Sequence, residues 1–196
     1  MKKITVLLIL LLVVSLSVSA QGFYFDAGLG FGRVWTKIDG NDVSDIFSGS
    51  DVIEMGVDLG FKAGYGPIAG LPLYIVGTIG GMGHGFFDMY HTQFNSYLIG
   101  PGVIFYPIPL IQLAGSMGLS FIANQTNIPG IVMLGNDGLG FAGDISVALD
   151  FGGSHHGFLL GFRYFVAVNT IEISNVKQNS SVFTVFGRYA FRNKMK

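Results

Sequence analysis

The sequence predicts an all-β protein, an eight-stranded antiparallel up-and-down transmembrane β-barrel preceded by a cleaved signal peptide. Half of the 196 residues are apolar, 12% are charged and 30 are glycine, whereas soluble domains average about 25% charged residues and about 7% glycine. Apolar residues alternate with other residues along eight segments, which is the two-residue period of a strand. The connections between these segments alternate between long and short, a pattern typical of outer-membrane barrels.

The N-terminal residues have the organisation of a secretory signal. Lys2 and Lys3 form a positive region, residues 4–14 form an apolar region, and small residues end at Ala20. We therefore expect a signal peptide over residues 1–20 that is cleaved after Ala20. An uncleaved membrane anchor is the alternative, and the shortness of the apolar run disfavours it.

Residues 53–65 show the strand alternation most clearly, because every odd position is apolar and every even position is charged or glycine. A soluble sandwich is disfavoured because the apolar face is so uniform and aromatic along so many segments. Each segment has the length of about 9–11 residues or more that a tilted strand needs to cross a bilayer. In order, the expected strands are residues 22–36, 52–65, 73–83, 95–106, 110–123, 139–151, 157–168 and 181–191. The facing of segment 73–83 stays open, because both of its faces are apolar.

The uncharged run over residues 94–136 could instead be taken for a membrane helix. Pro101, Pro107, Pro109 and Pro129 interrupt it, and each interior proline costs a helix about 3 kcal/mol. Strands are therefore expected here.

The expected connections place both chain ends on the periplasmic side of the membrane. The short ones cover residues 66–72, 107–109 and 152–156. The long ones, expected outside the cell, cover residues 37–51, 84–94, 124–138 and 169–180.

Charged residues on the inward positions of these strands form an expected lumen cluster: Asp26, Glu54, Asp58, Lys62, Asp144, Arg163 and Arg188. Eight strands enclose a lumen that side chains just fill, and buried charges need partners. We expect a salt-bridge plug; an ion gate with exchanging pairs, or a proton-transfer or catalytic role, are the alternatives. Inward glycines such as Gly28 and Gly60 either let the sheet coil, which we favour, or leave a hydrated path.

Aromatic residues on the outward positions predict a membrane girdle formed by Trp35, Tyr65, Tyr97, Tyr164 and Tyr189. Outer-membrane lipids are therefore expected partners. Arg33 breaks the outward pattern beside Trp35. We favour a snorkelling side chain without a specific partner, and contact with lipid phosphates is the alternative.

Several chemistries find no support in the sequence. The absence of cysteine excludes disulfides, zinc-thiolate sites and cysteine nucleophiles, and a net charge of −1 does not indicate nucleic acid. The aspartates of residues 37–51 lack the spacing of a calcium loop, so we expect no metal and no cofactor. A lipid-modifying enzyme needs a histidine near a serine and an acid. His84 and His91 show no such pairing in the sequence, so we expect no enzyme.

The last expected strand carries aromatic residues at alternate positions, with Gly187, Tyr189 and Phe191 as its marked residues. With this strand the chain resembles the small eight-stranded outer-membrane β-barrels, a group that includes the transmembrane domain of outer-membrane protein A and the outer-membrane proteins W and X. The resemblance implies that the barrel-assembly machinery reads this strand in a bacterial outer membrane. We expect the barrel to cover residues 21–191. A short basic tail over residues 192–196 follows Phe191, and there the chain departs from the family's pattern.

The expected function is that of a mostly plugged outer-membrane barrel whose external loops serve structural or surface-interaction roles. Residues 128–134 are mostly apolar and either pack across the barrel mouth or bind a partner, which leaves an extracellular ligand or a small hydrophobic solute open. An apolar barrel mouth resembles that of outer-membrane protein W, for which a role in the passage of hydrophobic solutes is proposed. The alternative function is a narrow channel or transporter for ions or small hydrophobic solutes, and a lipid-modifying enzyme is less favoured.

Overall fold

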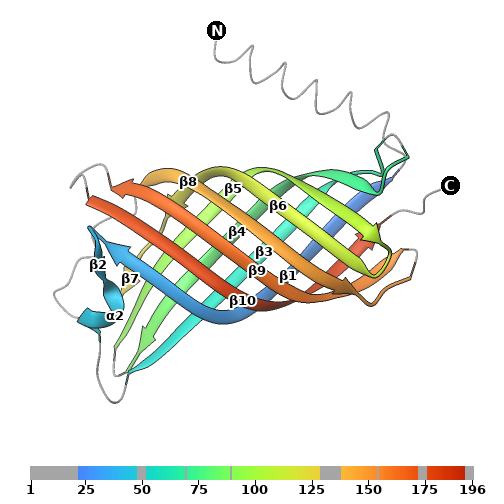
Figure 1. The fold of residues 1–196 in the computed structure, drawn as a ribbon. Helices are drawn as coiled ribbons and strands as arrows, with labels where there is room; N and C mark the ends of the chain where they lie inside the picture. Colours follow the sequence, from blue (N-terminus) through green and yellow to red (C-terminus); the bar gives the residue numbers. More distant parts are fainter. Residues whose placement is uncertain are drawn as a thin grey trace, which may run out of the picture.

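The computed structural model describes residues 22–47, 52–68, 70–88, 90–128, 138–153, 155–171 and 176–192. Within them, eight long strands close into one antiparallel barrel (Figure 1), which confirms the predicted fold. The long strands are β1 (Phe23–Ile38), β3 (Ile53–Tyr65), β4 (Leu73–Phe87), β5 (His91–Ile108), β6 (Ile111–Ile122), β8 (Leu139–Asp150), β9 (His156–Ile171) and β10 (Val176–Arg192). The predicted signal peptide lies outside the described residues.

The barrel has two different ends. The two-residue strands β2 (Asn41–Asp42) and β7 (Gln125–Thr126) and the short helix α2 (Val43–Ile46) lie at one end, which we call the loop end (Figure 1). The start of β1 and the finish of β10 lie at the opposite end, which we call the terminal end. None of the helices in the described ranges is long and apolar enough to cross a membrane.

Closure occurs between the first and the last long strand. The antiparallel register of β1 and β10 runs without interruption from Tyr24 opposite Arg192 to Ile38 opposite Gln178. Because closure pairs both edges of the sheet, no long strand is left with a free edge for aggregation. Arg192 therefore belongs to the barrel, whereas the sequence analysis assigned it to the tail.

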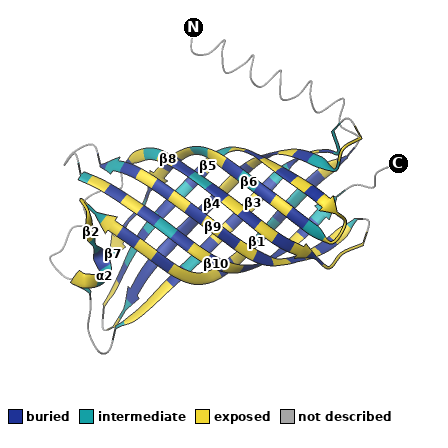
Figure 2. Cartoon of the chain, viewed as in Figure 1, coloured by how far each residue is buried: buried dark blue, intermediate teal, exposed yellow. Residues whose placement is uncertain are grey.

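Buried and exposed residues alternate along most of the length of the long strands, so that the burial colours form a chequered pattern (Figure 2). The exception is the stretch Gly80–Phe86 of β4, where every residue is buried. Most inward positions are buried, and most outward positions are exposed and apolar. The facing of β4 is now defined, with Tyr74, Val76 and Thr78 inward and Ile75 and Ile79 outward.

The predicted long connection over residues 84–94 is wrong. β4 continues to Phe87 and β5 begins at His91, with Phe87 directly opposite His91, so only residues 88–90 connect the two strands. Likewise β9 and β10 leave only residues 172–175 between them. The outward alternation of apolar residues stops where strands pass beyond a lipid-facing belt, but the backbone ladder continues. The end of the apolar alternation in the sequence therefore indicates the edge of the lipid-facing belt, and the strand itself extends further.

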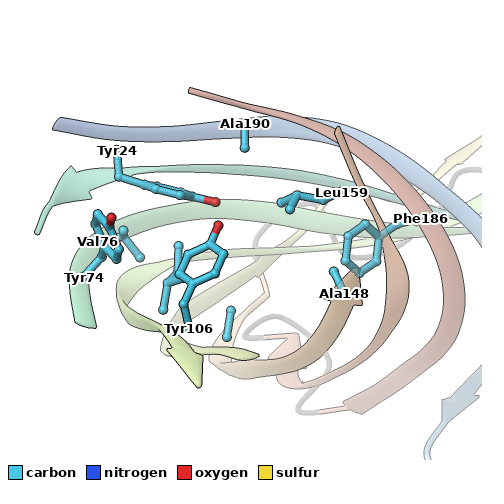
Figure 3. Packing of buried hydrophobic residues seen from close by; sticks show 10 residues of the cluster. Tyr24, Tyr74, Val76, Tyr106, Ala148, Leu159, Phe186 and Ala190 are labelled. Atoms are coloured by element: carbon cyan, nitrogen blue, oxygen red, sulfur yellow. The ribbon is translucent and has the colours of Figure 1, made fainter. Parts of the chain in front are cut away.

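The lumen contains three groups of buried apolar side chains in sequence from the terminal end to the loop end. The first group includes Tyr24, Tyr74 and Tyr106 (Figure 3). The second, which we call the apolar layer, consists of Val34, Met82, Leu98, Ala142, Phe165, Ala167 and Val182. The third lies at the loop end and consists of Val43, Phe86 and Phe94.

Candidate functional site

A cluster of buried charges fills the lumen between the first apolar group and the apolar layer. Arg163 of β9 reaches across the barrel: its Nη1 lies 2.7 Å from Asp58 Oδ2 on β3 and its Nε lies 2.7 Å from Asp144 Oδ2 on the adjacent β8. Lys62 Nζ lies 3.4 Å from the same Asp144 oxygen. All four side chains are fully buried. The bridge through Arg163 thus joins strands on opposite sides of the lumen.

The remaining pair of the cluster seals the seam between β1 and β10. Arg188 Nη1 lies 3.6 Å from Asp26 Oδ1, and the Arg188 guanidinium stacks 4.3 Å from the centre of the Phe186 ring. Among the described residues, the guanidinium nitrogens of Arg188 have no hydrogen-bond partner, so Arg188 is held more loosely than Arg163. Together the cluster contains three acids and three bases, and its formal charge is balanced: Asp26, Asp58, Asp144, Lys62, Arg163 and Arg188.

Inward glycines give the arginines their room. A Cβ at Gly60 would lie 2.6 Å from Arg188 Nη2, and a Cβ at Gly80 would lie 2.7 Å from Arg163 Nη2. Both distances are shorter than van der Waals contact allows. The space beside these glycines is therefore occupied by guanidinium groups, which leaves less room for the hydrated path that the sequence left open.

A hydrogen-bond chain connects the cluster to the terminal end of the barrel. Tyr24 donates to Asp26 Oδ2 (2.9 Å), and Gln112 Nε2 donates to the hydroxyls of Tyr24 and Tyr106 (2.8 Å each). Figure 3 shows these two hydroxyl groups pointing toward one another. Tyr106 in turn donates to Asp150 Oδ2 (3.1 Å).

The hydrogen-bond chain ends at Arg192. The Arg192 guanidinium pairs with Asp150 and lies 5.1 Å from the centre of the Tyr106 ring. Sequence reasoning missed Tyr24, Tyr106, Asp150 and Arg192. The inward parity of Asp150, six residues after Asp144 on the same strand, could have found it. The pairing of Arg192 could not have been found, because residues 192–196 read as a basic tail.

Glu54 does not join the cluster. It lies on the inward parity of β3 but at the loop end, where its side chain is 45% exposed and its Oε1 lies 2.8 Å from His84 Nε2. Ser44 of α2 also donates to this oxygen (3.2 Å), and Asp42 caps α2 by accepting from the Ser44 amide (3.0 Å). Glu54 therefore ties the first loop to β4, a role the sequence did not indicate because residue 84 was expected in a loop.

Among the described loop-end residues, Ser44 and His84 do not form a pair of nucleophile and base. Ser44 and His84 both contact Glu54 but not each other, so the carboxylate lies where a catalytic triad would need the imidazole. Nothing in the described residues groups three potential metal ligands. His91 is exposed, and its amide donates to Asn127.

A small pocket opens beside the loop-end apolar group. Its volume is about 50 Å³, which is room for a few water molecules. It is lined by Phe47, Val52, Phe86, Asp88, Tyr90, Thr92 and Ile128. Most of the apolar segment 128–134 lies outside the described residues.

The predicted girdle residues all face outward. Tyr65 ends β3 and Tyr189 lies near the end of β10, both at the terminal end, whereas Trp35 lies near the loop end of β1. Tyr97 and Tyr164 lie further inside β5 and β9, and Tyr97 stacks on Phe121. The last-strand residues Gly187, Tyr189 and Phe191 pair with Leu29, Ala27 and Phe25 of β1, and their reading by the assembly machinery stays a prediction.

The comparisons with known proteins identify the fold. No protein-family model and no curated protein sequence matches the chain. Several solved structures match it over most of their length, among them the following two. Ail, the attachment invasion locus protein of Yersinia pestis in complex with the heparin analogue sucrose octasulfate, is 14% identical with a TM-score of 0.51, covering 87% of this chain and 98% of that chain. Neisserial surface protein A is 16% identical with a TM-score of 0.52, covering 85% and 95%.

The chain thus has the fold of the small outer-membrane β-barrels. The family resemblance expected from the sequence is confirmed at this level.

Proposed function

We propose that this protein is a bacterial outer-membrane barrel with a closed, charge-paired lumen, whose loop end serves structural or surface-interaction roles outside the cell. The observation that carries this proposal is the bridge of Arg163 across the lumen to Asp58 and Asp144. The exposed apolar outer face supports the membrane location.

Three layers in series support closure of the lumen. An ion entering from the terminal end would have to separate the hydrogen-bonded tyrosines, then displace a member of the charge cluster, then cross the apolar layer. Each step removes partners from buried polar groups or places an ion among apolar side chains, and both are costly. The layered arrangement therefore favours a structural plug over an ion gate.

The chemistry of the loop end narrows the class of extracellular ligand. Ail was solved with a sulfated polyanion. Here the described residues of the first loop, the neighbouring inward position and the turn after β4 carry five acids, and only Lys37 and Lys177 oppose them at the ends of β1 and β10: Asp39, Asp42, Asp45, Glu54 and Asp88. This excess of carboxylates at the mouth would repel a polyanion, so a cationic or uncharged surface partner fits better.

The two other function classes receive less support. The loop-end pocket lined by Phe47, Phe86 and Tyr90 has a volume of about 50 Å³ and gives a hydrophobic solute no specific support. A hydrolase would need Ser44 to contact His84, and both contact Glu54 instead. We therefore propose a protein that is neither a solute transporter nor an enzyme.

Conductance measures closure directly. We expect residues 21–196, refolded and inserted into planar bilayers, to show no discrete openings over a wide range of voltage and pH. Insertion is checked independently by the blue-shifted emission of Trp35, the protein's single tryptophan. Discrete openings would contradict the plug. If openings occurred, Asp58→Asn would show whether the Arg163 bridge is the gate, because this variant weakens one arm of the bridge and conserves volume.

A further inference from the structure

The charged residues on the outward face of the barrel lie in one place. The outward positions of the eight long strands carry Arg33, Lys37 and Lys177, with no aspartate or glutamate among the described residues. Arg33 and Lys37 belong to β1 and Lys177 to its neighbour β10. Three cations and no anion at the outward positions of two adjacent strands form a localised positive surface. We call Arg33, Lys37 and Lys177, together with Trp35, the seam patch.

The register holds the seam patch together. Trp35 is opposite Ser181 and Lys37 is opposite Asn179. Lys177, two residues from Asn179 on the same face, is therefore a diagonal neighbour of Lys37, at the distance of about 7–8 Å that such positions share. The Arg33 guanidinium lies 5.4 Å from the centre of the Trp35 ring.

The height of the seam patch corresponds to the edge of a bilayer. Every outward residue of β1 from Phe23 to Phe31 is apolar, and Arg33 follows. With a rise of about 3.3 Å per residue and a strand tilt of about 40°, the ten residues from Phe23 to Arg33 span about 25 Å, the height of the apolar band of such barrels. Arg33 therefore lies at the boundary on the loop-end side, and Lys37 and Lys177 lie just beyond it.

The three cations form no ion pair with the described part of the protein, although two aspartates lie near the lysines. Arg33, Lys37 and Lys177 form no ion pair with the described residues. Asp42 is the cross-strand neighbour of Lys37, and the Asp39 amide donates to the Lys177 carbonyl oxygen (2.8 Å). Neither carboxylate forms an ion pair with Lys37 or Lys177, and that of Asp42 accepts from the Ser44 amide in capping α2. A guanidinium, two ammonium groups and an interfacial indole match a phosphorylated headgroup, because arginine and lysine bind phosphate and tryptophan sits at headgroup level.

We propose that the seam patch binds the phosphorylated headgroup of an outer-leaflet lipid. Arg33 contacts the phosphate at the membrane boundary, Lys37 and Lys177 contact anionic oxygens above it, and Trp35 packs beside the headgroup. This inference rests on the membrane location in the proposed function. It replaces the simple snorkelling that the sequence favoured for Arg33 with a specific anionic partner.

Trp35 allows a direct test, because it is the single tryptophan and lies within the seam patch. The protein is reconstituted in phosphatidylcholine vesicles that contain one brominated lipid, either phosphatidic acid or phosphatidylcholine. Both lipids carry their bromine atoms near the top of the acyl chains. Quenching of Trp35 then gives the relative binding constant of the two lipids. We expect a preference for phosphatidic acid of about fivefold per engaged cation, since one basic residue contributes about 1 kcal/mol near an anionic lipid surface.

A matched pair of variants isolates the seam patch from net charge. Lys37→Gln with Lys177→Gln is expected to reduce the preference about 25-fold, fivefold for each removed cation, and adding Arg33→Gln to bring it near unity. Lys194→Gln with Lys196→Gln removes the same charge from the last residues of the chain and is expected to leave the preference unchanged.

The outcomes separate this inference from the function on which it rests. Equal quenching by both lipids would overturn the headgroup site while leaving the membrane location intact. No quenching by either lipid would overturn the membrane location as well. Loss of the preference on replacing chloride by inorganic phosphate at equal ionic strength would show that the seam patch takes free phosphate rather than a lipid.

Discussion

Arg163→Leu is expected to lower the free energy of unfolding by about 3–5 kcal/mol, the range for breaking a buried ion pair by removing one partner. The guanidinium contacts Asp58 and Asp144, and it also donates to the Leu59 carbonyl oxygen (3.1 Å). Without it, Asp58 loses its ion-pair partner and Asp144 keeps only Lys62. The change is measured by unfolding the protein with guanidinium chloride in detergent micelles and following the emission of Trp35. The shift in the midpoint of the unfolding curve, at an unchanged slope, gives the change in the free energy of unfolding.

A second variant distinguishes lost charge balance from lost volume. Asp58→Leu with Arg163→Leu removes one acid and one base, so the cluster returns to neutrality with Asp144 still paired to Lys62. We expect this double variant to be more stable than Arg163→Leu alone, because apolar replacement of a whole buried pair is often neutral. Lys177→Leu removes an exposed cation outside the lumen and should change stability by less than about 0.5 kcal/mol. If the destabilisations of Asp58→Leu and Arg163→Leu simply add, the charge-paired plug is wrong.

The fold could be predicted from the sequence because the strands of a barrel alternate apolar and other residues with a period of two. Residues 53–65 alternate strictly, since one face meets an apolar medium and the other a packed lumen. The same parity placed Asp58, Lys62 and Arg163 inward, and the structure brings them together. Pairing partners could not be predicted, because Arg163 and Asp58 lie 105 residues apart and only closure makes them neighbours.

Other features escaped prediction where the apolar alternation ends although the strand continues. His84 lies beyond the apolar outward stretch of β4, so residues 84–94 were assigned to a loop and the contact of His84 with Glu54 was missed. At the terminal end, inward tyrosines have the same apolar character as outward ones. The tyrosines of the hydrogen-bond chain from Tyr24 to Asp150 could therefore not be told from girdle tyrosines by sequence alone.

The inward glycines of β1 have a structural cause that also yields a strong expected effect. A Cβ at Gly28 would collide with the Gly187 carbonyl oxygen and lie 2.6 Å from Arg188 Cα. Both atoms belong to the backbone of β10, the strand on which β1 closes, and cannot rotate away as a side chain can. Gly28 thus permits the close approach of the two strands at the seam, as expected for a glycine where backbones meet.

Gly28→Val is accordingly expected to prevent closure or to destabilise the barrel by more than about 3 kcal/mol, beyond the usual cost of overpacking. Gly77→Val is the matched control: Gly77 faces outward on β4, and the nearest heavy atom to its Cβ is the Ala63 carbonyl oxygen at 3.8 Å. Because valine favours strands, the control should fold at least as well as the wild type. The folded fraction is measured by the faster migration of unboiled protein on denaturing gels. The stability of the folded protein is measured by the midpoint of its unfolding in guanidinium chloride. Equal folding of the two variants would show that the seam can open to admit a side chain, and the inward glycines would then reflect only the coiling of the sheet.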